Sequence, residues 1–320
     1  MARRDVDVPT LVEAARSGSP RAVARLISLV EDASPRLREI MAALAPHAGH
    51  AHILGITGSP GVGKSTSTNA LVAAFRARGK RVGVLAVDPS SPFSGGALLG
   101  DRVRMQDHAL DPDVYIRSMA SRGHLGGLSW STPQAIRVLD AAGCDVVLVE
   151  TVGVGQSEVE IVGLADTTIV LLAPGMGDGI QAAKAGILEI GDLFVVNKAD
   201  REGADATVRD IRHMISLGDR KEPGLWRPPV VKTIAANGTG IDEVMEGIDK
   251  HVGWMGDNGE LRRRRQRRAA DEIEAIVLAQ LRERMGDLRG THGIEGLAGR
   301  VVDGDTDPYT AADAVLDEIT

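Results

Sequence analysis

Residues 58–65 combine the glycines, lysine and serine that a phosphate-binding loop requires. Their order, Gly-Ser-Pro-Gly-Val-Gly-Lys-Ser, has the G-x-x-x-x-G-K-S spacing of a P-loop. Glycines let the backbone turn tightly and aim its N–H groups at phosphate oxygens. Lys64 is expected to reach the β- and γ-phosphates of a nucleoside triphosphate, and Ser65 to ligate Mg²⁺. The predicted nucleotide-contacting residues of this loop are Gly58, Ser59, Pro60, Gly61, Val62, Gly63, Lys64, Ser65 and Thr66.

A second motif, Asn197-Lys198-Ala199-Asp200, indicates which base the nucleotide carries. The Asp200 carboxylate can accept from guanine N1–H and from the exocyclic amine, and adenine does not offer this pair of donors. Leaving such a charged acceptor unpaired costs about 1.5–3 kcal/mol. Lys198 is expected to lie over the base plane. A backbone N–H from Ala235, Ala236 or Asn237 is expected at the guanine oxygen. The two motifs together predict a GTPase that binds GTP and GDP.

Acidic residues at two expected strand ends complete the predicted phosphate site. Asp88 and Glu150 each follow an apolar run, and Asp101 lies in the Gly-Asp-Arg string between them. Oxygen ligands of this kind hold Mg²⁺ directly or through water. Ser65, Asp88, Asp101 and Glu150 are therefore the predicted metal ligands, and Lys64, Asp88, Asp101 and Glu150 the predicted catalytic residues. Gly153 is expected to bring its N–H to the γ-phosphate.

Apolar runs alternate with helical patterns across the middle of the chain, which predicts an α/β fold with a doubly wound, mainly parallel sheet. Strands are expected at 51–57, 81–87, 144–150, 192–197 and 230–234. Ligands of such sheets bind at the carboxyl ends of the strands, where both motifs fall. The predicted division is a helical arm at 1–48, a P-loop GTPase domain at 49–253 and a C-terminal helical extension at 254–320. Residues 253–259 are predicted to be a linker. Ser19-Pro20, Ser34-Pro35 and Asp307-Pro308 are predicted to begin helices.

Composition narrows the class of protein. The 320 residues carry a formal net charge of −7, which gives no reason to expect nucleic-acid binding. No apolar stretch approaches the roughly 20 residues of a membrane span, so no membrane association is expected. The single cysteine, Cys144, cannot form an internal disulfide; we expect it to be buried, in a reducing, cytoplasmic setting.

Several longer strings resemble a known family. They are GITGSPGVGKST at 55–66, VDPSSPFSGGALLGDRVRM at 87–105, ETVGVGQSE at 150–158, PGMGDGIQAAKAGILEI at 174–190 and NKAD at 197–200. The chain is similar to the metallochaperone-type GTPases of the SIMIBI class, and within them to the methylmalonyl-CoA mutase-associated GTPases (MeaB/MMAA type, often labelled ArgK). The resemblance implies a homodimer built by the C-terminal extension. It also implies a role in protecting or reloading an adenosylcobalamin-dependent acyl-CoA mutase, with 177–189 as a switch loop facing that partner.

Two other functions stay open at this point. The first is an ATP-dependent kinase or transport-linked ATPase, against which the Asn197–Asp200 tetrad argues. The second is a metal-inserting GTPase, because His47, His50 and His52 cluster near the P-loop strand. The chain has no Cys-x-x-Cys pair to support that second function. In many small G proteins a glutamine follows the switch glycine; here Val154 follows Gly153, which predicts slow hydrolysis without a partner.

Overall fold

The computed structural model describes residues 7–89, 106–108, 110–121, 131–151, 157–175, 190–217, 224–285 and 294–319. The chain divides into two compact units, Met1–Arg264 and Arg265–Thr320. The first unit holds the sheet and both nucleotide motifs, and the second is helical. Among the described residues, no helix has both the length and the apolar character needed to cross a membrane.

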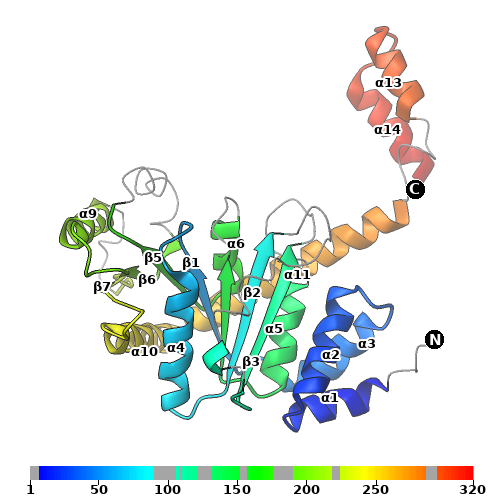
Figure 1. The fold of residues 1–320 in the computed structure, drawn as a ribbon. Coiled ribbons are helices and arrows are strands. Elements are labelled where there is room, and N and C mark those ends of the chain that lie inside the picture. Colours follow the sequence, from blue (N-terminus) through cyan, green and yellow to red (C-terminus); the bar gives the residue numbers. More distant parts are fainter. Residues whose placement is uncertain are drawn as a thin grey trace. The chain divides into compact units, whose positions relative to one another are not determined.

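A seven-stranded sheet forms the centre of the first unit (Figure 1). All its described pairings are parallel, which confirms the predicted fold class. The strand order is β3-β2-β4-β1-β5-β6-β7, so β1 lies at the centre of the sheet, with β4, β2 and β3 on one side and β5, β6 and β7 on the other. The strands are β1 (His52–Thr57), β2 (Val82–Pro89), β3 (Val114–Ser121), β4 (Val146–Thr151), β5 (Thr167–Leu172), β6 (Leu193–Val196) and β7 (Val230–Lys232).

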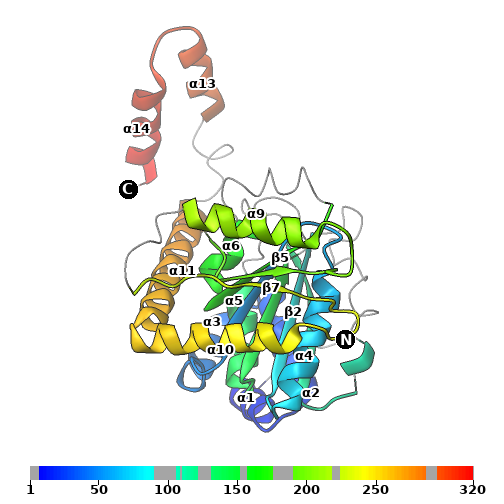
Figure 2. The same ribbon diagram turned by 90° about the vertical axis from the view of Figure 1, so that its left-hand side faces the viewer.

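Helices cover both faces of the sheet, because successive strand residues point to opposite sides and both sides are apolar. On β1, Ile53 belongs to a core shared with the N-terminal helices, whereas Leu54 and Ile56 belong to a core shared with α4 and α10. The helices of the first face are α1 (Val8–Arg16), α2 (Pro20–Glu31), α3 (Leu37–Leu44), α5 (Thr132–Ala141) and α6 (Ser157–Leu164). Those of the second face are α4 (Lys64–Ala77) and α10 (Ile241–Asp257), which Figure 2 shows in front of the sheet. Two 3₁₀ turns, η1 (Ala45–His47) and η2 (Gln106–His108), and α9 (Ala204–Leu217) complete the unit.

Two local predictions were wrong and one was confirmed. The Ser19 side chain caps α2 by accepting a bond from the Ala22 N–H at 3.4 Å, as expected. Ser34-Pro35 instead forms a turn: the Ser34 hydroxyl accepts from the Arg36 N–H at 3.3 Å, and α3 begins only at Leu37. Residues 253–257 are not a linker but the last turns of α10, because Met255 is fully buried on that helix. The chain turns at Gly259, where φ is +67°, before α11 (Glu260–Met285).

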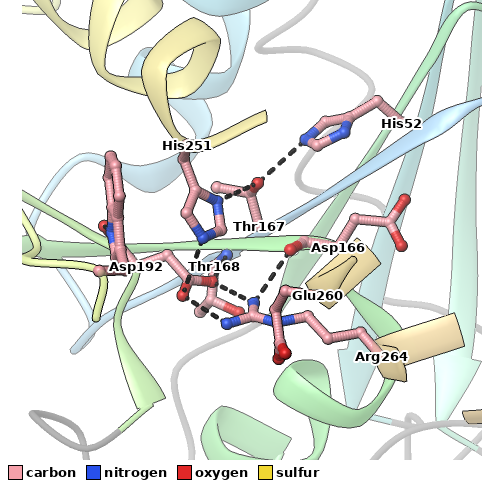
Figure 3. Close-up of polar contacts among 9 residues, drawn as sticks. His52, Asp166, Thr167, Thr168, Asp192, His251, Glu260 and Arg264 are labelled. Atoms are coloured by element: carbon pink, nitrogen blue, oxygen red, sulfur yellow. Dashed lines mark hydrogen bonds and ion pairs between the residues drawn. The ribbon is translucent and has the colours of Figure 1, made fainter. Parts of the chain in front are cut away.

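A buried ion pair fastens the start of α11 to the sheet (Figure 3). The Arg264 guanidinium donates two bonds to the Asp192 carboxylate, at 2.7 and 2.9 Å, and one to the Asp166 carbonyl at 3.0 Å. Asp192 also accepts from the Thr168 N–H at 2.9 Å. Burial opposes the charge on Arg264, but Asp192 and Glu260 outweigh it and raise the pKa of the guanidinium. Bidentate pairs of this kind fix orientation, so the first turn of α11 has a defined direction.

A histidine completes the same network. The Thr167 hydroxyl lies 2.7 Å from His251 Nδ1 and 3.0 Å from His52 Nε2. His251 Nε2 is 3.4 Å from Asp192 Oδ1, and the ring is packed by Trp226 and Trp254. Burial lowers the pKa of His251 to about 4, although the Asp192 charge acts in the opposite direction. The ring is therefore neutral at pH 7.

The second unit comprises residues 265–285 of α11 together with α13 (Ile294–Val302) and α14 (Pro308–Ile319). Asp307 caps α14 by accepting from the N–H groups of Tyr309 and Thr310, at 2.9 and 3.2 Å. This confirms the helix start predicted from Asp307-Pro308. Among the described side chains of α11, four large apolar ones are exposed: Ile273, Val277, Leu278 and Leu281.

Candidate nucleotide site

The P-loop connects the end of β1 to the start of α4, as its spacing predicts. Gly58, Gly61 and Gly63 all have positive φ values, at +143°, +81° and +95°. A Cβ at Gly58 would lie 2.3 Å from the Leu171 carbonyl oxygen. A Cβ at Gly63 would lie 2.4 Å from Asn197 Nδ2. The loop can therefore follow this path only with glycine at those two positions, and the helix directs its positive amino-terminal end toward the cradle.

Lys64 folds back over the loop that it follows. Its Nζ donates to the carbonyl oxygens of Gly58 at 2.6 Å and Ser59 at 3.2 Å, and the residue is only 9% exposed. A buried ammonium group held at the mouth of a backbone cradle suits an anionic ligand, because it supplies charge where solvent screens it least.

Glu150, at the end of β4, is held by two hydroxyl groups of α4. Ser65 Oγ donates to one carboxylate oxygen and Thr68 Oγ1 to the other, each at 2.8 Å. All three residues are buried. The structure thus brings the predicted metal ligands Ser65 and Glu150 into direct contact. Carboxylate and hydroxyl oxygens are the ligand types that Mg²⁺ prefers, so this pair fits the metal predicted there.

Thr68 is a further residue of this candidate site that the sequence motifs do not indicate. It lies three residues after Ser65, which places both hydroxyls on the same face of α4. The local spacing could have indicated that shared face. It could not have indicated Glu150 as the shared partner, because Glu150 lies on another strand.

The Asn197–Asp200 motif is tied to the P-loop through the side chain of Asn197. Its Nδ2 donates to the Val62 carbonyl oxygen at 2.9 Å. Its Oδ1 accepts from Thr233 Oγ1 at 3.1 Å and from the Ala235 N–H at 3.0 Å. One buried side chain therefore joins the phosphate loop, the end of β6 and the segment after β7. Thr233, which is also buried, is a second residue that the motifs did not indicate.

Lys198 and Asp200 flank that junction. Lys198 has a positive φ of +57°, and its Nζ donates to the Gly61 carbonyl oxygen at 2.5 Å. The side chain therefore reaches across to the tip of the P-loop. Asp200 is exposed. Asn237 forms a turn in which its side chain accepts from the Thr239 N–H at 3.1 Å, and Ala236 and Asn237 are exposed beside Ala235.

Part of the predicted site falls outside the described residues. Asp101, Gly153, Val154 and residues 177–189 belong to that part. Asp88 is described only in its backbone. It continues β2 one residue beyond Val87, which pairs with Thr151 on β4, so Asp88 and Glu150 end neighbouring strands.

Comparison with known proteins agrees with this geometry. Residues 23–288 match the family model described as "Methylmalonyl Co-A mutase-associated GTPase MeaB". A putative GTPase of Pyrococcus abyssi is 49% identical over 313 residues, which cover 98% of this chain and 97% of the relative. The "Methylmalonic aciduria type A homolog, mitochondrial" of Caenorhabditis elegans is 37% identical over 279 residues, covering 82% of this chain and 70% of the relative.

A solved structure shares the fold as well. The crystal structure of an "LAO/AO transport system kinase" has a TM-score of 0.73 and 27% identity, and the match covers 100% of this chain and 99% of that one. The family match spans most of the chain. It includes the P-loop, Glu150 with its donors Ser65 and Thr68, and Asn197 with its partners. The chain is therefore a P-loop GTPase and belongs to the MeaB family.

Proposed function

We propose that this GTPase uses the nucleotide site to assist an adenosylcobalamin-dependent mutase of the methylmalonyl-CoA type. The observation that supports a nucleotide-dependent function is the position of the Asn197 side chain. It donates to the Val62 carbonyl oxygen of the P-loop and accepts from the Ala235 N–H. Because one side chain contacts both the phosphate loop and the loop after β7, a movement of either loop alters the hydrogen bonds of the other. Such coupling is what a nucleotide-dependent switch requires.

Within this proposal each site residue has a chemical task. Lys64 and the P-loop N–H groups hold the phosphates and stabilise the charge that develops as the γ-phosphoryl group leaves. Asp200 reads guanine, Lys198 covers the base, and the Ala235–Asn237 segment supplies the N–H for the guanine oxygen. Mg²⁺ would neutralise phosphate charge when bound, held by Ser65, Asp88, Asp101 and Glu150.

The base specificity can be tested by competition between GTP and ATP for the purified protein. We expect GTP to bind at least about tenfold more tightly, from the cost of leaving Asp200 unpaired. Asp200→Asn should shift the preference toward xanthine nucleotides, and Asp205→Asn, an exposed aspartate on α9, serves as the control. Equal affinity for GTP and ATP would instead favour the transport-linked kinase named for the structural neighbour.

Two of the similarities support the mutase as client. One is the description of the matching family, and the other is the name of the Caenorhabditis elegans relative. The proposed direction of assistance is protection or reloading of the cobalamin cofactor. Pull-down of the mutase with GTP-loaded protein, and single-turnover hydrolysis with and without it, test the partnership. We expect slow hydrolysis alone and faster hydrolysis with the client. A rate of about 1 s⁻¹ or more without any partner contradicts this expectation.

The remaining alternative is metal insertion. Among the described residues no three histidine, cysteine or acidic side chains are grouped so that they could hold a metal ion. Metal titration of the nucleotide-free protein separates the two functions. Tight, stoichiometric binding of nickel or another transition metal would support insertion over mutase assistance.

The proposed assembly is a homodimer formed by the C-terminal extension at 254–320, outside the arm at 1–48 and the GTPase domain at 49–253. Its support is the exposed apolar group on α11, namely Ile273, Val277, Leu278 and Leu281. Exposed apolar side chains at helical spacing are typical of a helix that packs against a partner. Truncation after Asp257, followed by light scattering, tests this assembly, and a truncated protein that remains a dimer contradicts it.

A further inference from the structure

A cavity of about 670 Å³ lies at the edge of the sheet opposite to the nucleotide site. His52 and Val146, which line it, are the first residues of β1 and β4, whereas the P-loop follows the last residue of β1. In Figure 1 the strands begin at the lower edge of the sheet and end at the upper edge. The cavity is therefore separated from the phosphate cradle by the length of β1, about 17 Å for six residues.

The wall that contains the histidines is held in place by one carboxylate. Asp140, at the end of α5, accepts from three consecutive N–H groups: Gly49 at 2.5 Å, His50 at 3.1 Å and Ala51 at 2.9 Å. Asp140 itself is only 8% exposed. Because these bonds fix the loop backbone, the cavity is formed before any ligand enters, as in most small-molecule sites.

The acidic groups of the wall already have donors. Asp145 accepts from Lys80 Nζ at 3.3 Å and from the Arg81 N–H at 2.8 Å. Asp249 accepts from Arg78 Nη1 at 2.8 Å. With Asp140 held by the loop, none of the three lining carboxylates lacks a donor. The carboxylates of the wall are therefore already hydrogen-bonded by other groups of the protein.

The imidazoles of the wall are in a different situation. The rings of His47 and His50 have no partner among the described residues, and both line the cavity. Arg16 also lines it. In the part of the chain that the structure describes, its guanidinium bonds to Glu13, in a solvent-exposed pair at 2.7 Å that contributes little. The cavity wall thus offers the N–H groups of two imidazoles and one guanidinium to a ligand.

The rest of the lining is apolar. Phe75 from the end of α4 and Ile248 and Val252 from α10 face the same cavity. From this pairing we infer that the cavity binds a small organic anion, that is, a carboxylate or phosphate group carried on an apolar body. The imidazoles and Arg16 receive the anionic group, and the α4–α10 side receives the apolar body. No described cluster of histidine, cysteine and acidic residues has the arrangement needed for a metal ion, so the imidazoles are assigned to the anion.

The test uses the full chain loaded with a non-hydrolysable GTP analogue, so that all phosphate positions of the P-loop are occupied and the loop cannot take up the probe. Phenyl phosphate, phenylacetate, inorganic phosphate and benzyl alcohol are titrated separately, and binding is measured by calorimetry and by NMR of ¹³C-labelled histidine rings. We expect phenyl phosphate or phenylacetate to bind with a Kd on the order of 1 mM or tighter, as ligands of this size do. The two anions show which of the two head groups the site prefers. The ring signals of His47 and His50 should move.

Variants locate the binding. The double change His47→Gln and His50→Gln should weaken binding about tenfold, because it removes groups that can donate to an anion with charge assistance. Val252→Phe, which narrows the cavity and leaves both histidines in the chain, should weaken it as well. His213→Gln makes the same chemical change at an exposed histidine of α9 and should leave binding unaltered. Three outcomes overturn the inference: no movement of the His47 and His50 signals, equal binding of benzyl alcohol, or unchanged affinity in the double variant.

Discussion

Thr68 offers the sharpest test of how the nucleotide site is built. Its side chain is fully buried and donates to Glu150 Oε2 at 2.8 Å. Thr68→Val keeps the shape of the side chain and removes only the hydroxyl group. Glu150 then keeps its bond from Ser65 but loses a donor on its other oxygen.

The magnitude follows from the charge on the acceptor. A hydrogen bond to a charged group contributes about 1.5–3 kcal/mol, and the buried carboxylate has one donor fewer in the variant. We expect the free energy of unfolding to fall by about 1–3 kcal/mol. Because the carboxylate is also less well positioned for Mg²⁺, the Mg²⁺ concentration for half-maximal GTP hydrolysis should rise about tenfold, the equivalent of about 1.4 kcal/mol.

Urea unfolding and Mg²⁺ titration of hydrolysis at saturating GTP measure the two effects separately. Thr68→Ser is the matched control, because it keeps the hydroxyl and should restore a near-normal Mg²⁺ requirement. If Thr68→Val loses stability but its Mg²⁺ requirement does not rise, the Thr68–Glu150 hydrogen bond is structural and Glu150 does not organise the metal. If neither quantity changes, the hydrogen bond itself contributes nothing measurable.

Three further outcomes are expected. Gly63→Ala should lower the free energy of unfolding by about 1–3 kcal/mol and abolish nucleotide binding, because its Cβ would strike Asn197. Gly79→Ala is the control: its φ is also positive, at +73°, but no atom lies within 4 Å of the added Cβ, so it tests backbone strain alone. Equal effects of the two variants on urea unfolding and nucleotide binding would contradict the steric explanation. The pKa of His251 lies near 4 in the folded protein against 6.5 unfolded. Unfolding therefore takes up a proton between those values, and stability that is full above about pH 6.5 should fall by about 3 kcal/mol toward pH 4. His251→Asn should lack this part of the slope in urea unfolding at several pH values, and identical slopes would disprove the assignment. Burial raises the pKa of the Cys144 thiol to about 12. A disulfide reagent at pH 8 should therefore label the thiol only as fast as the chain unfolds. Labelling at the rate of a free thiol would contradict the buried position.

The sequence was sufficient wherever the chemistry is local. The P-loop needs eight consecutive residues, and its glycines, lysine and serine carry their roles in their spacing. The strands at 51–57, 81–87 and 144–150 were recognisable as well, because a parallel strand buried on both faces must be a continuous apolar run. The same local logic placed the Ser19 and Asp307 caps correctly.

Tertiary structure decided what depends on residues far apart in the chain. Asn197 bonds to Val62, and Thr68 to Glu150, only because the order of the strands brings β6, β1 and β4 together at one edge. Residues 253–257 are helical despite two glycines, because burial of Met255 outweighs the weak helix propensity of glycine. The histidines at 47–52 likewise became part of a cavity only when Asp140 fixed their loop against α5. No local pattern encodes such contacts, since their free energy comes from surfaces that meet only in the folded chain.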